Sequence, residues 1–210
     1  MIIIYFVESF CGVLAVLLTH ELGHLIAARW YGVQVLRFSI GLGPEALGFT
    51  DRTGTRWTLA ILPFGASLQM NDDRNSISSL QVFSNKSLNQ RAVIYVAGPL
   101  FNLLFAGGIY VCSFAIFGEG ALLVSEKPAV IFMSLLSGFS VLVALFSLIP
   151  IPPLDGGWLV LFGIEVFTRR PIPERIQKTI CTVGTAMIVV ATMISFLAVA
   201  SHVVAENSVS

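Results

Sequence analysis

The residue types and spacing best suited to chemistry are those of His20-Glu21-Leu22-Gly23-His24, at the inner end of an apolar run. On a helix, His20 and His24 project from one face about 5–6 Å apart. This spacing lets two imidazoles bind one tetrahedral zinc ion. Glu21 lies next to His20 around the helix, where its carboxylate reaches a water molecule without binding the metal itself. The segment matches the H-E-x-x-H signature of zinc hydrolases; the alternative is a polar helix end that extends to the membrane interface.

The composition indicates that the helix carrying this segment spans a membrane. Of the 210 residues, 56% are hydrophobic and 11% are charged, against about 25% charged residues in soluble domains. Four apolar segments are long enough to cross a bilayer, namely residues 3–27, 93–117, 130–163 with a proline-rich break, and 179–200. We therefore expect a membrane α-helical fold of about four transmembrane helices, forming one domain over residues 1–210. The formal net charge of zero offers no basic surface for nucleic acid.

The basic residues predict the orientation of these segments. Seven of the twelve lie between the first two segments, four lie between the last two, and Lys127 lies between the second and third. The positive-inside rule then places the two basic loops in the cytoplasm and both termini outside. His20 lies about 25 Å along the first helix, so we expect the metal inside the membrane, nearer its cytoplasmic face. The first segment has no basic stretch before its apolar run, which favours a retained span over a cleaved signal peptide.

The cytoplasmic loop, residues 31–84, has the pattern of short strands rather than helix. Residues 34–40 alternate in polarity until Gly41-Leu42-Gly43-Pro44 breaks the pattern. Two β-rich runs, Thr55–Leu62 and Ala66–Met70, are separated by a Pro-Phe-Gly turn. We therefore expect a small β-hairpin or sheet associated with the membrane.

Two interpretations of this hairpin remain open. It is either a cytoplasmic cap or an edge strand that handles substrate. In the second case Ser67, Leu68 and Gln69 would pair with an extended peptide, because strand addition uses main-chain hydrogen bonds. The polar run Asn71–Asn85 is expected to be a surface loop.

Two further segments place polar groups at membrane depth. Ala97-Gly98-Pro99-Leu100-Phe101-Asn102 opens the second span, and Asn102 is a costly group in hydrocarbon. We expect its amide to bind the unwound backbone of a substrate, and we expect Gly98 to serve close helix packing. The third span ends in Pro150-Ile151-Pro152-Pro153, which cannot continue a regular helix. Asp155 follows this break, and it is the candidate for the third zinc ligand beside an open fourth position.

These three motifs together resemble the site-2 protease family of intramembrane zinc proteases, and most closely the bacterial regulator-of-sigma-E protease group. The resemblance implies that His20, His24 and Asp155 bind zinc and that Glu21 is the catalytic carboxylate. It also implies a location in the bacterial inner membrane and a β-hairpin that pairs with an unwound substrate. The substrate would be a single-span membrane protein, such as an anti-sigma factor or a signal-peptide remnant.

The sequence departs from that group in ways that concern the substrate rather than the metal. Only about residues 118–129 separate the second and third spans, so the PDZ domains usual there are expected to be absent. Ser147 stands where the group has an asparagine, which makes it a candidate substrate-binding residue. Trp158 stands where a histidine is common, and Gly65-Ala66-Ser67 replaces Gly-Gly-Tyr.

We expect zinc-assisted peptide hydrolysis inside the membrane. Zinc lowers the pKa of water toward about 7 and polarises a carbonyl, and Glu21 would transfer the proton from water to the leaving amine. The alternative is a catalytically idle scaffold that binds zinc structurally. Structural zinc sites have four protein ligands, whereas the sequence offers three, which favours the enzyme. A metal transporter is less favoured, because the later spans carry no further carboxylate or histidine at their centres.

Overall fold

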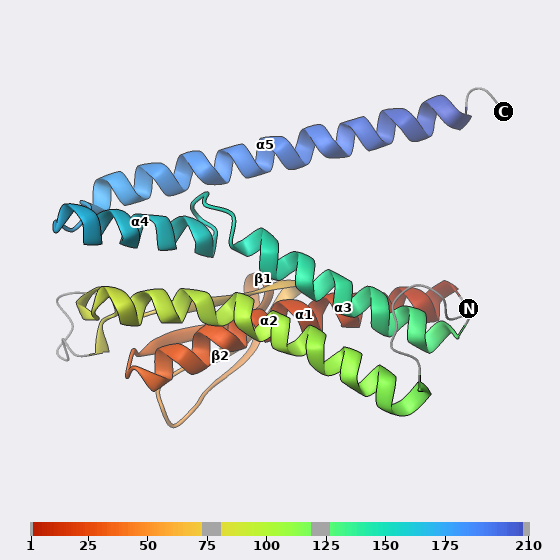
Figure 1. Ribbon diagram of the computed structural model, residues 1–210, viewed down its shortest axis with the longest axis horizontal. Coiled ribbons are helices and arrows are strands. Elements are labelled where there is room, and N and C mark those ends of the chain that lie inside the picture. The colour runs from red at the N-terminus through yellow and green to blue at the C-terminus, as the bar shows by residue number, and fades with distance from the viewer. Residues whose placement is uncertain (1, 73–80, 119–126, 208–210) are drawn as a thin grey trace. The chain divides into compact units, whose positions relative to one another are not determined.

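The computed structural model describes residues 2–72, 81–118 and 127–207, and these residues are mostly helical (Figure 1). The chain divides into two units, Met1–Leu148 and Ile149–Ser210. The first unit contains α1 (Ile2–Trp30), β1 (Val35–Thr50), β2 (Arg56–Met70), the short 3-10 helix η2 (Phe83–Asn85), α2 (Leu88–Phe117) and α3 (Pro128–Ser147). The second unit contains α4 (Asp155–Thr168) and α5 (Glu174–Asn207).

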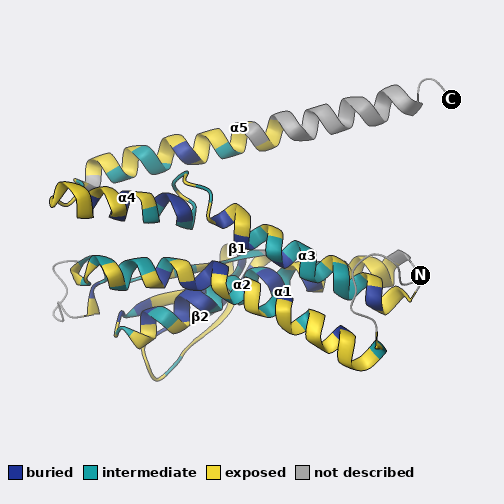
Figure 2. Ribbon diagram, in the orientation of Figure 1, coloured by how far each residue is buried: buried dark blue, intermediate teal, exposed yellow. Residues whose placement is uncertain are grey.

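Three helices in the described part of the chain, α1, α2 and α3, are long and apolar enough to cross a membrane. Their apolar side chains are largely exposed, for example Leu104 at 62% and Leu135 at 68%, as expected for helices that contact lipid (Figure 2). The fourth predicted span, residues 179–200, lies within α5. The prediction of a membrane α-helical fold with a small sheet between the first two helices is confirmed.

Helix α2 begins five residues earlier than the predicted span because a capping box fixes its first turn. The Ser87 hydroxyl accepts from the Gln90 backbone N–H at 3.4 Å, and the Ser87 N–H donates to the Gln90 side-chain oxygen at 3.1 Å. These reciprocal bonds satisfy two N–H groups that a helix start leaves free. The apolar pattern alone starts at residue 93, because the first turn is polar.

β1 and β2 pair antiparallel in a two-stranded sheet whose register shifts several times. Phe38 of β1 pairs with both Leu68 and Trp57, so both ends of β2 meet the same part of β1. The predicted break at residues 41–44 is wrong, since β1 continues to Thr50. Gly41 and Gly43 have φ angles of 92° and 97°, which only glycine adopts readily. These angles bend β1 without ending its pairing.

The sheet is fastened to α1 by an apolar core. Leu25 and Ala28 of α1 pack with Val35 and Phe38 of β1 and with Ile94 of α2, and all five are at most 3% exposed. Buried residues gather where α1, α2 and the sheet meet (Figure 2). The helix that carries the two histidines and the strands are therefore parts of one packed body.

A polar contact adds to this attachment at the turn between the strands. The Arg29 guanidinium, at the end of α1, donates to the Asp51 carboxylate at 2.6 Å. Asp51 also accepts bonds from Thr53, from the Trp57 indole at 3.0 Å and from the Thr55 backbone N–H at 3.0 Å. The Thr53 hydroxyl first, then Trp57 and Arg29, hold the pKa of Asp51 well below its usual range. The turn is thus held to the helix by a carboxylate that stays ionised at neutral pH.

The described ends of the predicted surface loop, Asn71–Asn85, are partly buried: Asp72, Gln81 and Asn85 are exposed as expected, whereas two residues are not. Asn71 is 5% exposed and Val82 is fully buried. The backbone N–H of Asn71 donates to the Gln34 carbonyl at 2.8 Å, and the N–H of Phe83 donates to the Asn71 carbonyl at 2.8 Å. These bonds join Asn71 to the residue before β1 and Phe83 to Asn71, while residues 73–80 lie outside the described residues.

The second unit begins with the proline-rich break. No regular helix forms between Leu148 and Leu154, as the prolines require. Helix α4 then runs to Thr168, five residues beyond the predicted end of the segment. Its buried Glu165 accepts a bond from the Ile172 backbone N–H at 2.9 Å, which ties α4 to the connection before α5.

Candidate metal centre

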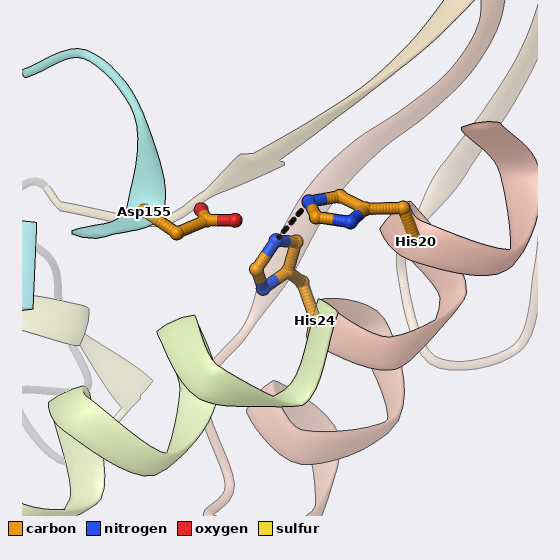
Figure 3. A group of neighbouring side chains, drawn as sticks. All are labelled: His20, His24 and Asp155. Carbon is orange, nitrogen blue, oxygen red and sulfur yellow. Dashed lines mark hydrogen bonds between the residues drawn. The ribbon is translucent and has the colours of Figure 1, made fainter. Parts of the chain in front are cut away.

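Helix α1 brings the two histidines of the H-E-x-x-H segment together. The Nε2 atoms of His20 and His24 lie 3.2 Å apart, and their ring centroids lie 4.8 Å apart with the planes at 81° (Figure 3). This is the arrangement that a spacing of four residues predicts on a helix. Both rings thus present a nitrogen, Nε2, to one point, as two ligands of one metal ion must.

The surroundings of His24 fix which of its nitrogens carries the proton. His24 is 6% exposed, and its Nδ1 lies 2.7 Å from the backbone carbonyl oxygen of Ile94 in α2. A carbonyl only accepts, so Nδ1 must be the donor. In the neutral ring the lone pair then lies on Nε2, the atom that faces His20. Such a carbonyl partner is common for histidines that bind metals.

The close approach of α1 and α2 depends on two glycines. A Cβ on Gly23 would lie 2.9 Å from the backbone carbon of Ala97. A Cβ on Gly98 would lie 2.6 Å from His24 Cε1 and 2.9 Å from His20 Nε2. Gly98 was predicted to serve packing alone. The structure adds that its missing side chain keeps open the space beside the two ring nitrogens.

The remaining predicted residues occupy several elements. Glu21 is half-buried on α1, one residue after His20. Asn102 of α2 is fully buried, with its Nδ2 atom 3.2 Å from His20 Nδ1. Ser147 is buried at the end of α3 and its hydroxyl donates to the Ala144 carbonyl at 2.9 Å. In the second unit, Asp155 is the first residue of α4.

The donor types predicted from the sequence suit zinc better than the other common ions. Two imidazoles and one carboxylate give mixed nitrogen and oxygen ligands, which zinc accepts in catalytic sites with one position left for water. Calcium and magnesium prefer oxygen ligands alone. Gly98 supplies the room beside the two nitrogens that an ion needs.

The candidate substrate strand lies at one side of the sheet. Ser67, Leu68 and Gln69 each have one strand partner among the described residues, on β1. The side chains of Ser67 and Gln69 are exposed, whereas Leu68 is half-buried and packs against the apolar core. One side of this segment therefore has no strand paired to it in the described part of the chain.

Comparisons with known proteins agree with these motifs. The sequence profile of peptidase family M50 matches residues 9–132 and 121–191. A Brucella suis protein named "Putative zinc metalloprotease" is 37% identical over 118 residues, or 50% of this chain and 31% of the relative. The Regulator of sigma-E protease RseP of Escherichia coli is 45% identical over 103 residues, or 47% of this chain and 23% of the relative. The matched part thus spans about a quarter to a third of these relatives.

Proposed function

Since the chain belongs to peptidase family M50, the site-2 protease family, we propose that it is an intramembrane zinc metalloendopeptidase that hydrolyses peptide bonds within or near transmembrane segments. The observation that carries this proposal is the pair of Nε2 atoms 3.2 Å apart on a helix long and apolar enough to span a membrane. Ionisable side chains are costly at membrane depth, so a pair of them there points to a function.

In this proposal His20, His24 and Asp155 hold the metal, and the three are drawn in Figure 3. Support comes from the ligand atoms that they offer, two imidazole nitrogens and a carboxylate oxygen. Zinc bound there supplies a Lewis acid that lowers the pKa of water and polarises the scissile carbonyl. His24 is held in the required tautomer by the Ile94 carbonyl.

Glu21 acts as the general base. Its carboxylate removes a proton from the attacking water as the oxygen bonds to the carbonyl carbon of the substrate. The same proton is then given to the amine nitrogen as the carbon–nitrogen bond breaks. Glu21 suits this role because it follows His20 directly on α1, so that it lies beside the histidine pair without belonging to it.

The substrate has to be extended where it is cut, because a helix ties its own carbonyls and amides into a hydrogen-bonded ladder. We assign the binding of the extended segment to Ser67, Leu68 and Gln69, whose strand is paired on one side in the described residues. Single-span membrane proteins, such as an anti-sigma factor or a signal-peptide remnant, are the proposed substrates. The enzyme would lie in the bacterial inner membrane with its site toward the cytoplasm.

Glu21→Gln tests the proposal in purified protein on a model transmembrane substrate. We expect cleavage to fall by about 10²–10⁴-fold, the usual contribution of a general base, while the zinc content stays near that of the wild type. His24→Ala should lose both zinc and cleavage. A zinc-loaded wild type that cleaves no transmembrane substrate would instead indicate an idle scaffold, and full activity of Glu21→Gln would rule out this mechanism.

A further inference from the structure

Asn102 contacts the histidine pair from α2. Its side chain is fully buried, and its Nδ2 atom lies 3.2 Å from Nδ1 of His20. The carboxamide oxygen, Oδ1, is also buried and has no hydrogen-bond partner among the described residues. The hydrogen bond with His20 is therefore the interaction that favours one orientation of the Asn102 carboxamide over the other.

The two histidines differ in the partner of Nδ1. The Ile94 carbonyl beside His24 can only accept a hydrogen bond. The Asn102 carboxamide beside His20 can donate through Nδ2 or accept through Oδ1, because the two ends have almost the same shape and exchange by a rotation of the side chain. The tautomer of His24 is thus fixed, whereas the tautomer of His20 depends on the orientation of the Asn102 carboxamide.

One of the two orientations of the carboxamide suits the histidine pair without a metal ion. When Nδ2 donates to His20 Nδ1, the His20 proton lies on Nε2. That proton points toward the lone pair of His24 Nε2, 3.2 Å away. A chain of bonds then runs from Asn102 through His20 and His24 to Ile94.

A metal ion between the Nε2 atoms requires the opposite arrangement. Both Nε2 atoms must then offer lone pairs, so the His20 proton has to move to Nδ1. If Nδ2 of Asn102 still faced Nδ1 of His20, two hydrogen-bond donors would point at each other. Rotation of the carboxamide replaces Nδ2 by Oδ1, which accepts the bond.

We propose that Asn102 is a positioning residue of the metal site, whose Oδ1 accepts from His20 Nδ1 when zinc is bound and whose Nδ2 donates to it when zinc is absent. The inference rests on the proposed zinc site. It assigns Asn102 to the metal, in place of the direct contact with substrate that the sequence suggested.

The test measures zinc affinity by competition with a chelator, so that no substrate is needed. Asn102→Leu keeps the approximate volume and removes both hydrogen-bonding groups, and we expect zinc affinity to fall about 10–100-fold, as is usual when the partner of a ligating histidine is lost. Asn102→Asp keeps an acceptor and should bind zinc at least as well as the wild type. The matched control is Ser140→Ala, because Ser140 donates to the Asn102 backbone carbonyl at 2.8 Å and does not touch the carboxamide.

A second measurement uses the wild type alone. The chain has three histidines, so ¹⁵N labelling of histidine gives few ring signals. His20 should carry its proton on Nε2 without metal and on Nδ1 after zinc is added.

Three results would overturn the inference alone: wild-type zinc affinity in Asn102→Leu, an equal loss in Asn102→Asp, or a His20 proton that stays on Nε2 with zinc bound. Failure of the wild type to bind zinc at all would overturn the proposed function and this inference together.

Discussion

Single residues of α2 set the properties of the two imidazoles on α1. Ile94 supplies a carbonyl to His24, Asn102 supplies a carboxamide to His20, and Gly98 leaves room beside both Nε2 atoms. These three positions recur at intervals of four on one helix, so they lie along one face of it. The second span is therefore as much a part of the candidate metal centre as the helix with the histidines.

Gly98→Ala should weaken zinc binding. The added methyl would lie 2.6 Å from His24 Cε1 and 2.9 Å from His20 Nε2, which forces the rings away from their shared point. Overpacking of this kind costs about 1–3 kcal/mol, equivalent to about 5–150-fold in zinc affinity. A chelator titration of the purified protein measures the change.

Gly107→Ala is the control, because a Cβ at Gly107 on the same helix meets no atom within 4 Å. Equal zinc affinity in the two alanine variants would show that Gly98 has no part in the metal site.

At the scale of elements, β2 has different environments at its two ends. The beginning of β2 pairs with two parts of β1, because Trp57 faces both Phe38 and Phe49. Residues 66–70 pair with β1 on one side among the described residues. The end of β2 is therefore the part that can accept another strand, and the substrate proposal depends on it.

Proline at Ser67, Leu68 or Gln69 tests this role. Each substitution removes a backbone donor and fixes φ, and a variant whose N–H faces the substrate should lose about tenfold in cleavage, the value of one hydrogen bond of about 1.4 kcal/mol. Zinc content should not change, because the proposed ligands lie on other elements. Cleavage of a transmembrane substrate by zinc-loaded variants is the measurement.

The control for the proline series is Arg52→Pro. Arg52 is exposed at the second position of a turn in which the Gly54 N–H donates to the Asp51 carbonyl at 3.1 Å, a position where proline is favoured. If all three strand variants cleave as well as Arg52→Pro, the sheet is a cap and not a substrate site.

At the scale of the whole molecule, the predicted orientation in the membrane rests on the two basic loops. Arg52 and Arg170 are exposed residues of these loops. In a background without the three native cysteines, single cysteines at both positions should resist a membrane-impermeant thiol reagent in intact cells and react after lysis. Reaction of either cysteine before lysis would place its loop outside and overturn the predicted topology.

Sequence patterns predicted the features that depend on local spacing. Histidines four residues apart share a face on any helix, and the prolines from Pro150 onward exclude a regular helix there, so both were accessible without a structure. The hydrogen-bond partners of the histidines could not be predicted from the sequence, because the contacts of Asn102 and Ile94 with α1 depend on how two helices pack. The continuous path of β1 was missed because Gly41 and Gly43 are read as a break, although a positive φ can also bend a strand that stays paired.

The attachment of the sheet to α1 has a consequence for the choice of the bond that is cut. Leu25, Ala28 and Arg29 fasten the strands to the same helix that carries His20 and His24. The distance from the strand to the catalytic point is therefore built into the protein. If the strand binds the substrate as proposed, the peptide bond that is cut is set by its distance along the substrate from the residues paired with the strand. Substrates unrelated in sequence would then be cut at equivalent positions, so that length along the chain and not side-chain identity would select the bond.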